Sequence, residues 1–132
     1  MKLSKLIFLL LLISNFSISN AETLGVDFLE PQNGDVLSGP FKVRFVVKGM
    51  DLRPAGDLTV NTGHHHLLIN SQAIEAGKIV PANDTHIHFG KGQTETTLDL
   101  PKGRHRLTLQ FANGMHESYG EVMSKTIEIS VQ

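Results

Sequence analysis

Three stretches of this chain alternate between apolar and polar residues, a pattern typical of β-strands with one buried face. They cover residues 41–48, 104–111 and 123–131. Side chains at positions i and i+2 of a strand share a face, so the apolar members of each stretch are expected to point into one core. Glycine, proline and asparagine separate the stretches and favour turns. The pattern predicts an all-β chain, with one short helical possibility around residues 72–76.

The number of such segments indicates the architecture. Shorter strand-like segments include residues 26–29, 64–70, 86–89 and 94–100, which brings the expected number of strands to about seven. About seven short strands with turn signals between them, in roughly 110 residues, is typical of an immunoglobulin-like antiparallel β-sandwich. A small β-barrel would have a similar number of strands and remains an alternative.

The first 21 residues have the features of a cleavable signal peptide. Lys2 and Lys5 precede an apolar run at residues 6–13, and the segment ends in small residues at Ala21. This apolar run is shorter than the roughly 20 residues that span a bilayer, although an uncleaved membrane anchor remains an alternative. We expect cleavage after Ala21, a single domain over residues 22–132, and a periplasmic or secreted location without a membrane segment.

Composition excludes several functional classes. The chain has no cysteine, so it forms no disulfide and carries no lipid-modified cysteine. Its formal net charge is −1, and it has no tryptophan and one tyrosine. Without a basic run, a nucleic-acid partner is not expected. No spacing of serine, histidine and aspartate suggests a catalytic triad, so the chain is interpreted as a binding protein rather than an enzyme.

Histidine is the residue type that points to chemistry. The chain has seven histidines, and five of them lie between positions 64 and 88 in two His-x-His motifs. If the two motifs occupy neighbouring strands, four imidazoles share one surface at distances that suit a single metal ion. A further histidine lies in the loop before the last strand. The candidate metal ligands are His64, His66, His86, His88 and His116.

The donor set suggests which ion binds. Imidazole suits copper and zinc, and the thioethers of Met115 and Met123 would favour copper, especially Cu(I). Because metal binding requires neutral imidazoles, we expect proton release on binding. The role of His65, in the opposite orientation, stays open. His105 lies in line with core residues and is interpreted as a hydrogen-bonded histidine at the core edge, and packing is the default role of Met123.

These motifs resemble one known family. The segments are residues 61–69, residues 86–96, residues 100–105, His116, and Met123 with Ser124. Together they are similar to the exported bacterial family catalogued as domain of unknown function 4399. The resemblance supplies a fold expectation and a motif but no activity. It implies that all seven histidines occupy the family's own histidine positions, whereas the loop at residues 113–121 departs from the family's acidic and proline-containing pattern.

Two functions follow from this sequence. The first is a periplasmic protein that holds a copper or zinc ion and serves in metal binding, buffering or delivery, with a possible protein partner in the cell envelope. The second is a metal-free interaction module in which the histidines form a structural hydrogen-bonded cluster. A three-histidine metal enzyme with an open water position is a third possibility.

Overall fold

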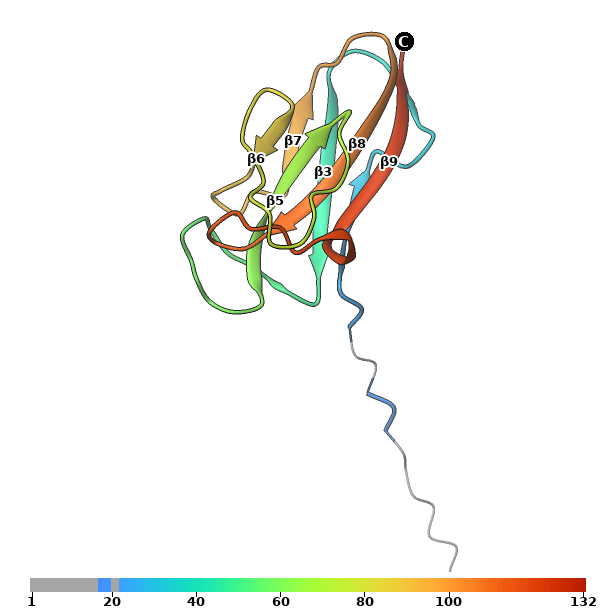
Figure 1. The fold of residues 1–132 in the computed structure, drawn as a ribbon. Coiled ribbons are helices and arrows are strands. Elements are labelled where there is room, and N and C mark those ends of the chain that lie inside the picture. Colours follow the sequence, from blue (N-terminus) through green and yellow to red (C-terminus); the bar gives the residue numbers. More distant parts are fainter. Residues whose placement is uncertain (1–16, 20–21) are drawn as a thin grey trace, which may run out of the picture.

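β-Strands make up nearly all the regular structure in this computed structural model, which describes residues 17–19 and 22–132 (Figure 1). Within these residues there are nine strands and one short 3₁₀ helix. In chain order they are β1 (Gly25–Glu30), β2 (Val36–Leu37), β3 (Phe41–Lys48), β4 (Asp51–Leu52), β5 (Thr62–Ile69), β6 (His86–His88), β7 (Glu95–Leu98), β8 (Gly103–Ala112), η1 (Glu121–Met123) and β9 (Ser124–Val131). The prediction of an all-β chain is confirmed.

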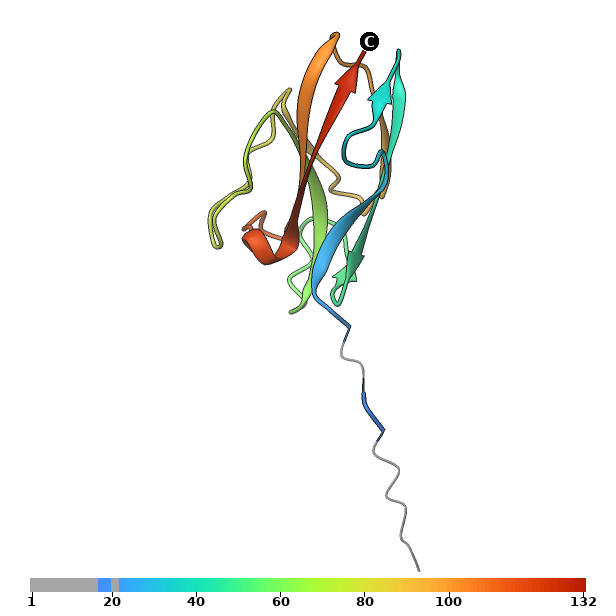
Figure 2. The same ribbon diagram turned by 90° about the vertical axis from the view of Figure 1, so that its right-hand side faces the viewer.

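The strands form two sheets. The smaller sheet has the order β1-β3-β7, and the larger has the order β2-β9-β8-β5-β4, with β6 also paired to β5. Figure 2 shows the layers edge-on, with β1 and β3 in blue and cyan opposite β8 and β9 in orange and red. In the larger sheet, β5 therefore has β8 along one edge and the short strands β4 and β6 along the other.

The core lies between the two sheets and follows the alternation in the sequence. Phe41, Val43 and Phe45 of β3 are buried, while the charged residues between them are exposed. They pack against alternate residues of β5, β8 and β9, including Leu109 and Ile127. Burial of these apolar side chains, at about 25 cal/mol per Å² of area removed from water, is what holds the sheets together in the absence of disulfides.

The structure differs from the sequence prediction in its details. Nine strands are present rather than about seven, because β2 and β4 have two residues each and show no period. Both short strands pair in parallel, so the larger sheet is not purely antiparallel. Residues 72–76 form no helix. There, the side chain of Gln110 accepts a hydrogen bond from the backbone N–H of Ile74 and the Ser118 hydroxyl donates one to its carbonyl, which holds the segment extended against the sheet.

The outer face of the larger sheet is covered as well. Thr108 and Gln110 of β8 point away from the core, yet both are fully buried. The Thr108 hydroxyl donates a hydrogen bond to the Ser71 carbonyl, and Gln110 donates one to the Gly120 carbonyl. The segments that follow β5 and β8 therefore lie over this face, and Figure 2 shows the segment between β5 and β6 on the side away from the smaller sheet. The histidines lie in this covered region.

The expected signal peptide falls almost wholly outside the described residues, apart from positions 17–19. Within the part of the chain that the structure describes, no helix has the length and apolarity needed to cross a membrane.

Candidate metal centre

Strand β5 carries histidines toward both sides of the larger sheet. All eight of its residues are buried, because the core covers one face and the loops cover the other. Leu67 and Ile69 belong to the core between the sheets, whereas Leu68 packs with Val80 and Ala112 beneath the loops. By the period of two, His64 and His66 share the loop-covered face with Leu68, and His65 points into the core. The His-x-His spacing thus places two fully buried imidazoles side by side.

Two further histidines join them from different elements. Strand β6 pairs antiparallel with β5 so that His88 lies opposite His66. His116 comes from the turn that follows β8. One ring nitrogen from each of the four histidines lies within 4.8 Å of the other three, an arrangement that could hold a metal ion. His64 and His66 form the buried base of the group, while His88 and His116 are partly exposed.

Three of the imidazoles converge through the same ring atom. The Nε2 atom of His88 lies 3.1 Å from Nε2 of His64 and 3.0 Å from Nε2 of His116. A neutral imidazole has either one hydrogen or one lone pair at Nε2, so His88 cannot form a linear hydrogen bond to both neighbours. Both ring nitrogens of His66 and Nδ1 of His64 are buried without a hydrogen-bond partner. A cation bound by one nitrogen of each ring would remove the conflict at His88 Nε2 and give His66 one of its missing partners.

The environment keeps the imidazoles neutral. Burial, reinforced by the neighbouring imidazoles of His88 and His116, lowers the pKa of His64 to about 4. Burial and the other three histidines of the group lower the pKa of His66 to about 3. The pKa of His88 is also lowered, first by burial and then by His116. At neutral pH these nitrogens therefore carry free lone pairs, which is the state that binds a metal ion.

His86 lies outside this group. It was expected as a ligand because His86 and His88 share a face, but the register of β5 and β6 places it opposite Leu68, beyond the end of the histidine pair. Its Nδ1 lies 3.0 Å from the Thr85 hydroxyl and 3.2 Å from the side-chain oxygen of Asn83. The structure thus brings together His64, His66, His88 and His116 and leaves His86 in its own polar contacts.

The remaining histidines have separate surroundings. His65 is fully buried between Phe45 and Phe111, with ring centroids 4.8 and 5.1 Å away, and neither of its nitrogens has a hydrogen-bond partner. Burial, followed by the neighbouring His64, lowers the pKa of His65 to about 3. His105 lies at the sheet end, where Nδ1 contacts the side chain of Asn70 and Nε2 the carbonyl of Pro101. Hydrogen bonding of His105 agrees with its interpretation from the sequence.

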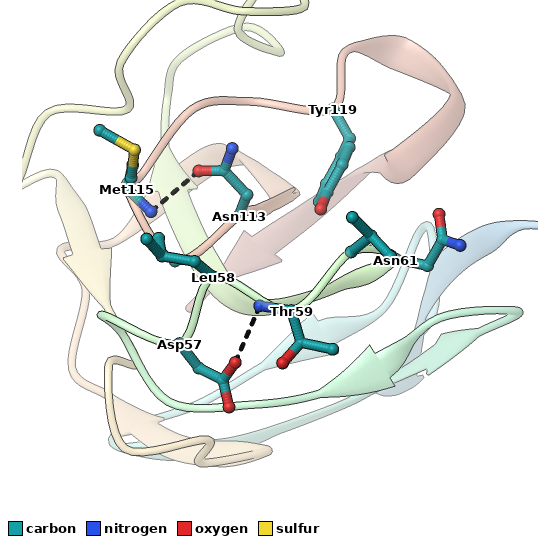
Figure 3. Close-up of a pocket in the computed structure, with 9 residues that line it drawn as sticks. Asp57, Leu58, Thr59, Asn61, Asn113, Met115 and Tyr119 are labelled. Carbon is teal, nitrogen blue, oxygen red and sulfur yellow. Dashed lines mark hydrogen bonds between the residues drawn. The ribbon is translucent and has the colours of Figure 1, made fainter.

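The two methionines have different surroundings. Met123 is fully buried in the core, as its alternation with Ile127 and Ile129 predicted. Met115 lies on the same turn as His116, is 59% exposed and lines a pocket. This pocket, shown in Figure 3, has a volume of about 400 Å³ and lies between residues 57–61 and the turn, with Tyr119 among its walls. The thioether argument for Cu(I) therefore rests on Met115, next to His116, because Met123 packs in the core.

Gly90 is part of the site that sequence reasoning missed. A Cβ atom at this position would lie 2.3 Å from Cε1 and 2.7 Å from Nε2 of His88, so only glycine leaves room for the ring where it now lies. In the sequence, this glycine follows the second His-x-His motif by two residues, but a glycine there equally indicates the end of a strand. Only the position of the ring distinguishes the two.

Fold and site together define a small two-sheet β-protein that gathers four imidazoles beneath the loops on the outer face of its larger sheet. The chain belongs to the family described as domain of unknown function 4399, which matches residues 43–132 and so includes all seven histidines. The resemblance stated from the motifs is confirmed.

Comparison with other proteins adds only to the fold. No curated protein matches the sequence. Among solved structures, the X-ray structure of the endo-β-1,4-mannanase from Thermotoga petrophila is similar, with a TM-score of 0.50 and 18% sequence identity. The alignment covers 83% of this chain but 20% of that one, so the chain spans about a fifth of the mannanase's length. At this identity the likeness concerns the fold alone.

Proposed function

We propose that this protein binds one transition-metal ion through His64, His66, His88 and His116, for binding, buffering or delivery of the metal. The observation that carries the proposal is the approach of the Nε2 atoms of His64 and His116 to that of His88, at 3.1 and 3.0 Å, where burial lowers the pKa of His64 and of His88. Metal–imidazole bonds are about 2.0–2.1 Å long, so ligand atoms on opposite sides of an ion are about 4.1 Å apart. All four atoms already lie within 4.8 Å, so the widest pair needs to close by about 0.7 Å for ligands on opposite sides of the ion and by about 1.5 Å for tetrahedral ones.

The affinity order of divalent ions for imidazole favours copper over zinc. Ligand atoms at right angles around such an ion are about 2.9 Å apart, and those at the tetrahedral angle about 3.3 Å apart. The 3.0 Å separation is nearer the right-angle value and the 3.1 Å separation lies midway between the two, so the distances are compatible with either geometry. Imidazole donors also bind Cu(II) more tightly than Zn(II) in general. We therefore propose Cu(II) first and zinc second.

Partial exposure of His88 and His116 supports a role in exchange. The ion would be held from below by buried rings and reached from the solvent side, so it could be gained and lost without unfolding. We further infer an immunoglobulin-like sandwich for the two packed sheets and, from the expected signal peptide, a periplasmic or secreted location. A protein partner in the cell envelope remains part of this proposal.

A metal titration tests the function. Metal-free protein is titrated with Cu(II) and Zn(II) beside the His64→Ala/His88→Ala double variant. A matched control, His86→Ala/His105→Ala, also removes two histidines but leaves the group intact. We expect one ion per chain for the wild type and the control, and at least a hundredfold weaker binding for the first variant. Equal, weak binding by all three proteins would refute the proposal.

Chelation separates this proposal from the metal-free alternative. A ligand present at a thousand times its dissociation constant stabilises the folded state by about 4 kcal/mol. The thermal midpoint of metal-loaded protein should therefore fall when a chelator is added. A structural histidine cluster in a metal-free interaction module predicts a midpoint that does not respond to metal or chelator.

A further inference from the structure

We propose that Asn113 is a positioning residue of the metal centre, which acts through His116. This inference rests on the proposed metal-binding function. His64, His66 and His88 lie on paired strands, and their relative positions are fixed by the ladder between β5 and β6. His116 lies on no strand, so something else must bring its Nε2 to the other three. The turn at residues 113–117, which we call the latch, does so.

The side chain of Asn113 forms three hydrogen bonds within the latch. Its Oδ1 accepts from the backbone N–H of Met115 at 2.9 Å and of Glu117 at 3.0 Å, and the first of these is drawn in Figure 3. Its Nδ2 donates to a carboxylate oxygen of Glu117 at 2.8 Å. The backbone closes the same turn, since Asn113 N–H donates to the Glu117 carbonyl and His116 N–H to the Asn113 carbonyl. Asn113 therefore bonds to residues on both sides of His116.

The backbone of His116 needs such support. Its φ is 67°, in the left-handed region that costs a non-glycine residue about 1–2 kcal/mol. A chain free to relax would leave this conformation and turn the imidazole away from the group. From outside the latch, the Val80 N–H donates to the His116 carbonyl at 2.9 Å and the Ser118 N–H donates to the Lys78 carbonyl at 2.8 Å, which fixes the chain where it leaves the turn.

The latch is also fixed to the body of the protein at Gly114. A Cβ there would lie 2.0 Å from the backbone oxygen of Asp57, and the Gly114 carbonyl accepts a hydrogen bond from Gly56 at 2.9 Å. The turn thus begins from a fixed point. Between this point and the bridge to residues 78–80, the Asn113 bonds hold the backbone on either side of His116, which makes Asn113 the side chain that orients this ligand.

Variants of the latch give the test. The Asn113→Ala variant removes all three bonds, and we expect its Cu(II) affinity to fall about 10–100-fold, the range for residues that orient a ligand. Its Cu(II) absorption and electron paramagnetic resonance spectra should shift toward those of His116→Ala. In the His116→Ala background, Asn113→Ala should have no further effect on affinity. Asn83→Ala is the matched control, because Asn83 Oδ1 accepts from the N–H of Thr85 in a similar turn that ends at His86.

A compensating pair keeps the inference testable if Asn113→Ala fails to fold. Asn113→Asp retains the acceptor but sets a carboxylate against that of Glu117, so affinity should fall. Adding Glu117→Gln restores a donor–acceptor pair and should recover most of the loss.

Two results would overturn the role of Asn113 alone, while leaving the metal function intact. They are unchanged affinity in Asn113→Ala, and an equal loss of affinity with and without His116. A wild-type protein that binds no Cu(II) would instead refute the metal function, and the role of Asn113 with it.

Discussion

A Gly90→Ala substitution is expected to weaken metal binding while leaving the stability of the fold nearly unchanged. Alanine at this position adds a Cβ that would lie 2.3 Å from Cε1 and 2.7 Å from Nε2 of His88. Ordinary contacts between such atoms are about 3.5 Å or longer, so the ring must move by about 1 Å. Metal–ligand distances tolerate only about 0.2 Å. His88 would therefore leave the position in which it approaches His64 and His116.

The cost of this change should fall on binding rather than on stability. His88 is partly exposed, so its ring can swing toward solvent without opening the core. The φ angle of Gly90 is not positive, so alanine can adopt the same backbone conformation. We expect the free energy of unfolding of the metal-free protein to change by less than about 1 kcal/mol. Affinity for Cu(II) should fall by about 10–100-fold, as when a ligand loses its orientation.

Calorimetric titration with Cu(II) and urea denaturation of the metal-free protein measure the two effects. Gly25→Ala is the matched control, because it also lacks a positive φ and its added Cβ would meet nothing within 4 Å. Wild-type affinity in Gly90→Ala would refute the placement of His88 as a ligand. A loss of stability of several kcal/mol would show that the alanine displaces backbone rather than the ring.

Three further predictions concern the histidines. The His65→Leu variant removes two buried nitrogens that have no hydrogen-bond partner, so we expect its free energy of unfolding to rise by about 1–3 kcal/mol. Urea denaturation at pH 7 measures this, and a decrease would contradict the account. The folded pKa values of His64, about 4, and His66, about 3, lie below the unfolded value of 6.5, so the unfolded chain binds more protons below pH 6.5. The stability that these two neutral imidazoles contribute to the metal-free protein is therefore fully present above pH 6.5 and is lost as the pH falls toward 4. The loss is at most about 1.4 kcal/mol per pH unit for each imidazole. Denaturation midpoints that do not change between pH 7 and 5 would exclude this effect. For the same reason His64 and His66 should release almost no protons on Cu(II) binding at pH 7 or at pH 5, fewer than the sequence alone suggested. Calorimetry in buffers of different ionisation enthalpy measures the release. We expect at most about two protons per ion at pH 5 from the group of four, and release of about four would show that His64 and His66 are not held neutral.

Much of the fold was predictable because alternation is a local property. The inward faces of β3, β8 and β9 follow from the period of two, and the structure buries the side chains that the pattern indicated. Strands β2 and β4 were missed because two residues have no period. The absence of a helix at residues 72–76 was also beyond the sequence pattern, since the partners of Ile74 come from Gln110 and Ser118, far along the chain.

Within the candidate site, the sequence by itself determined which histidines share a face: the spacing fixes His64 with His66 and His86 with His88. Only the tertiary structure decided which of them meet. The register between β5 and β6 sets His88 opposite His66 and moves His86 one pair beyond the group, and spacing within a strand says nothing about register between strands. The fourth position depends on a left-handed turn that brings His116 over the sheet, held by side-chain bonds of Asn113. Burial beneath the loops, which lowers the pKa of His64, His66 and His88, is likewise a property of the folded chain alone.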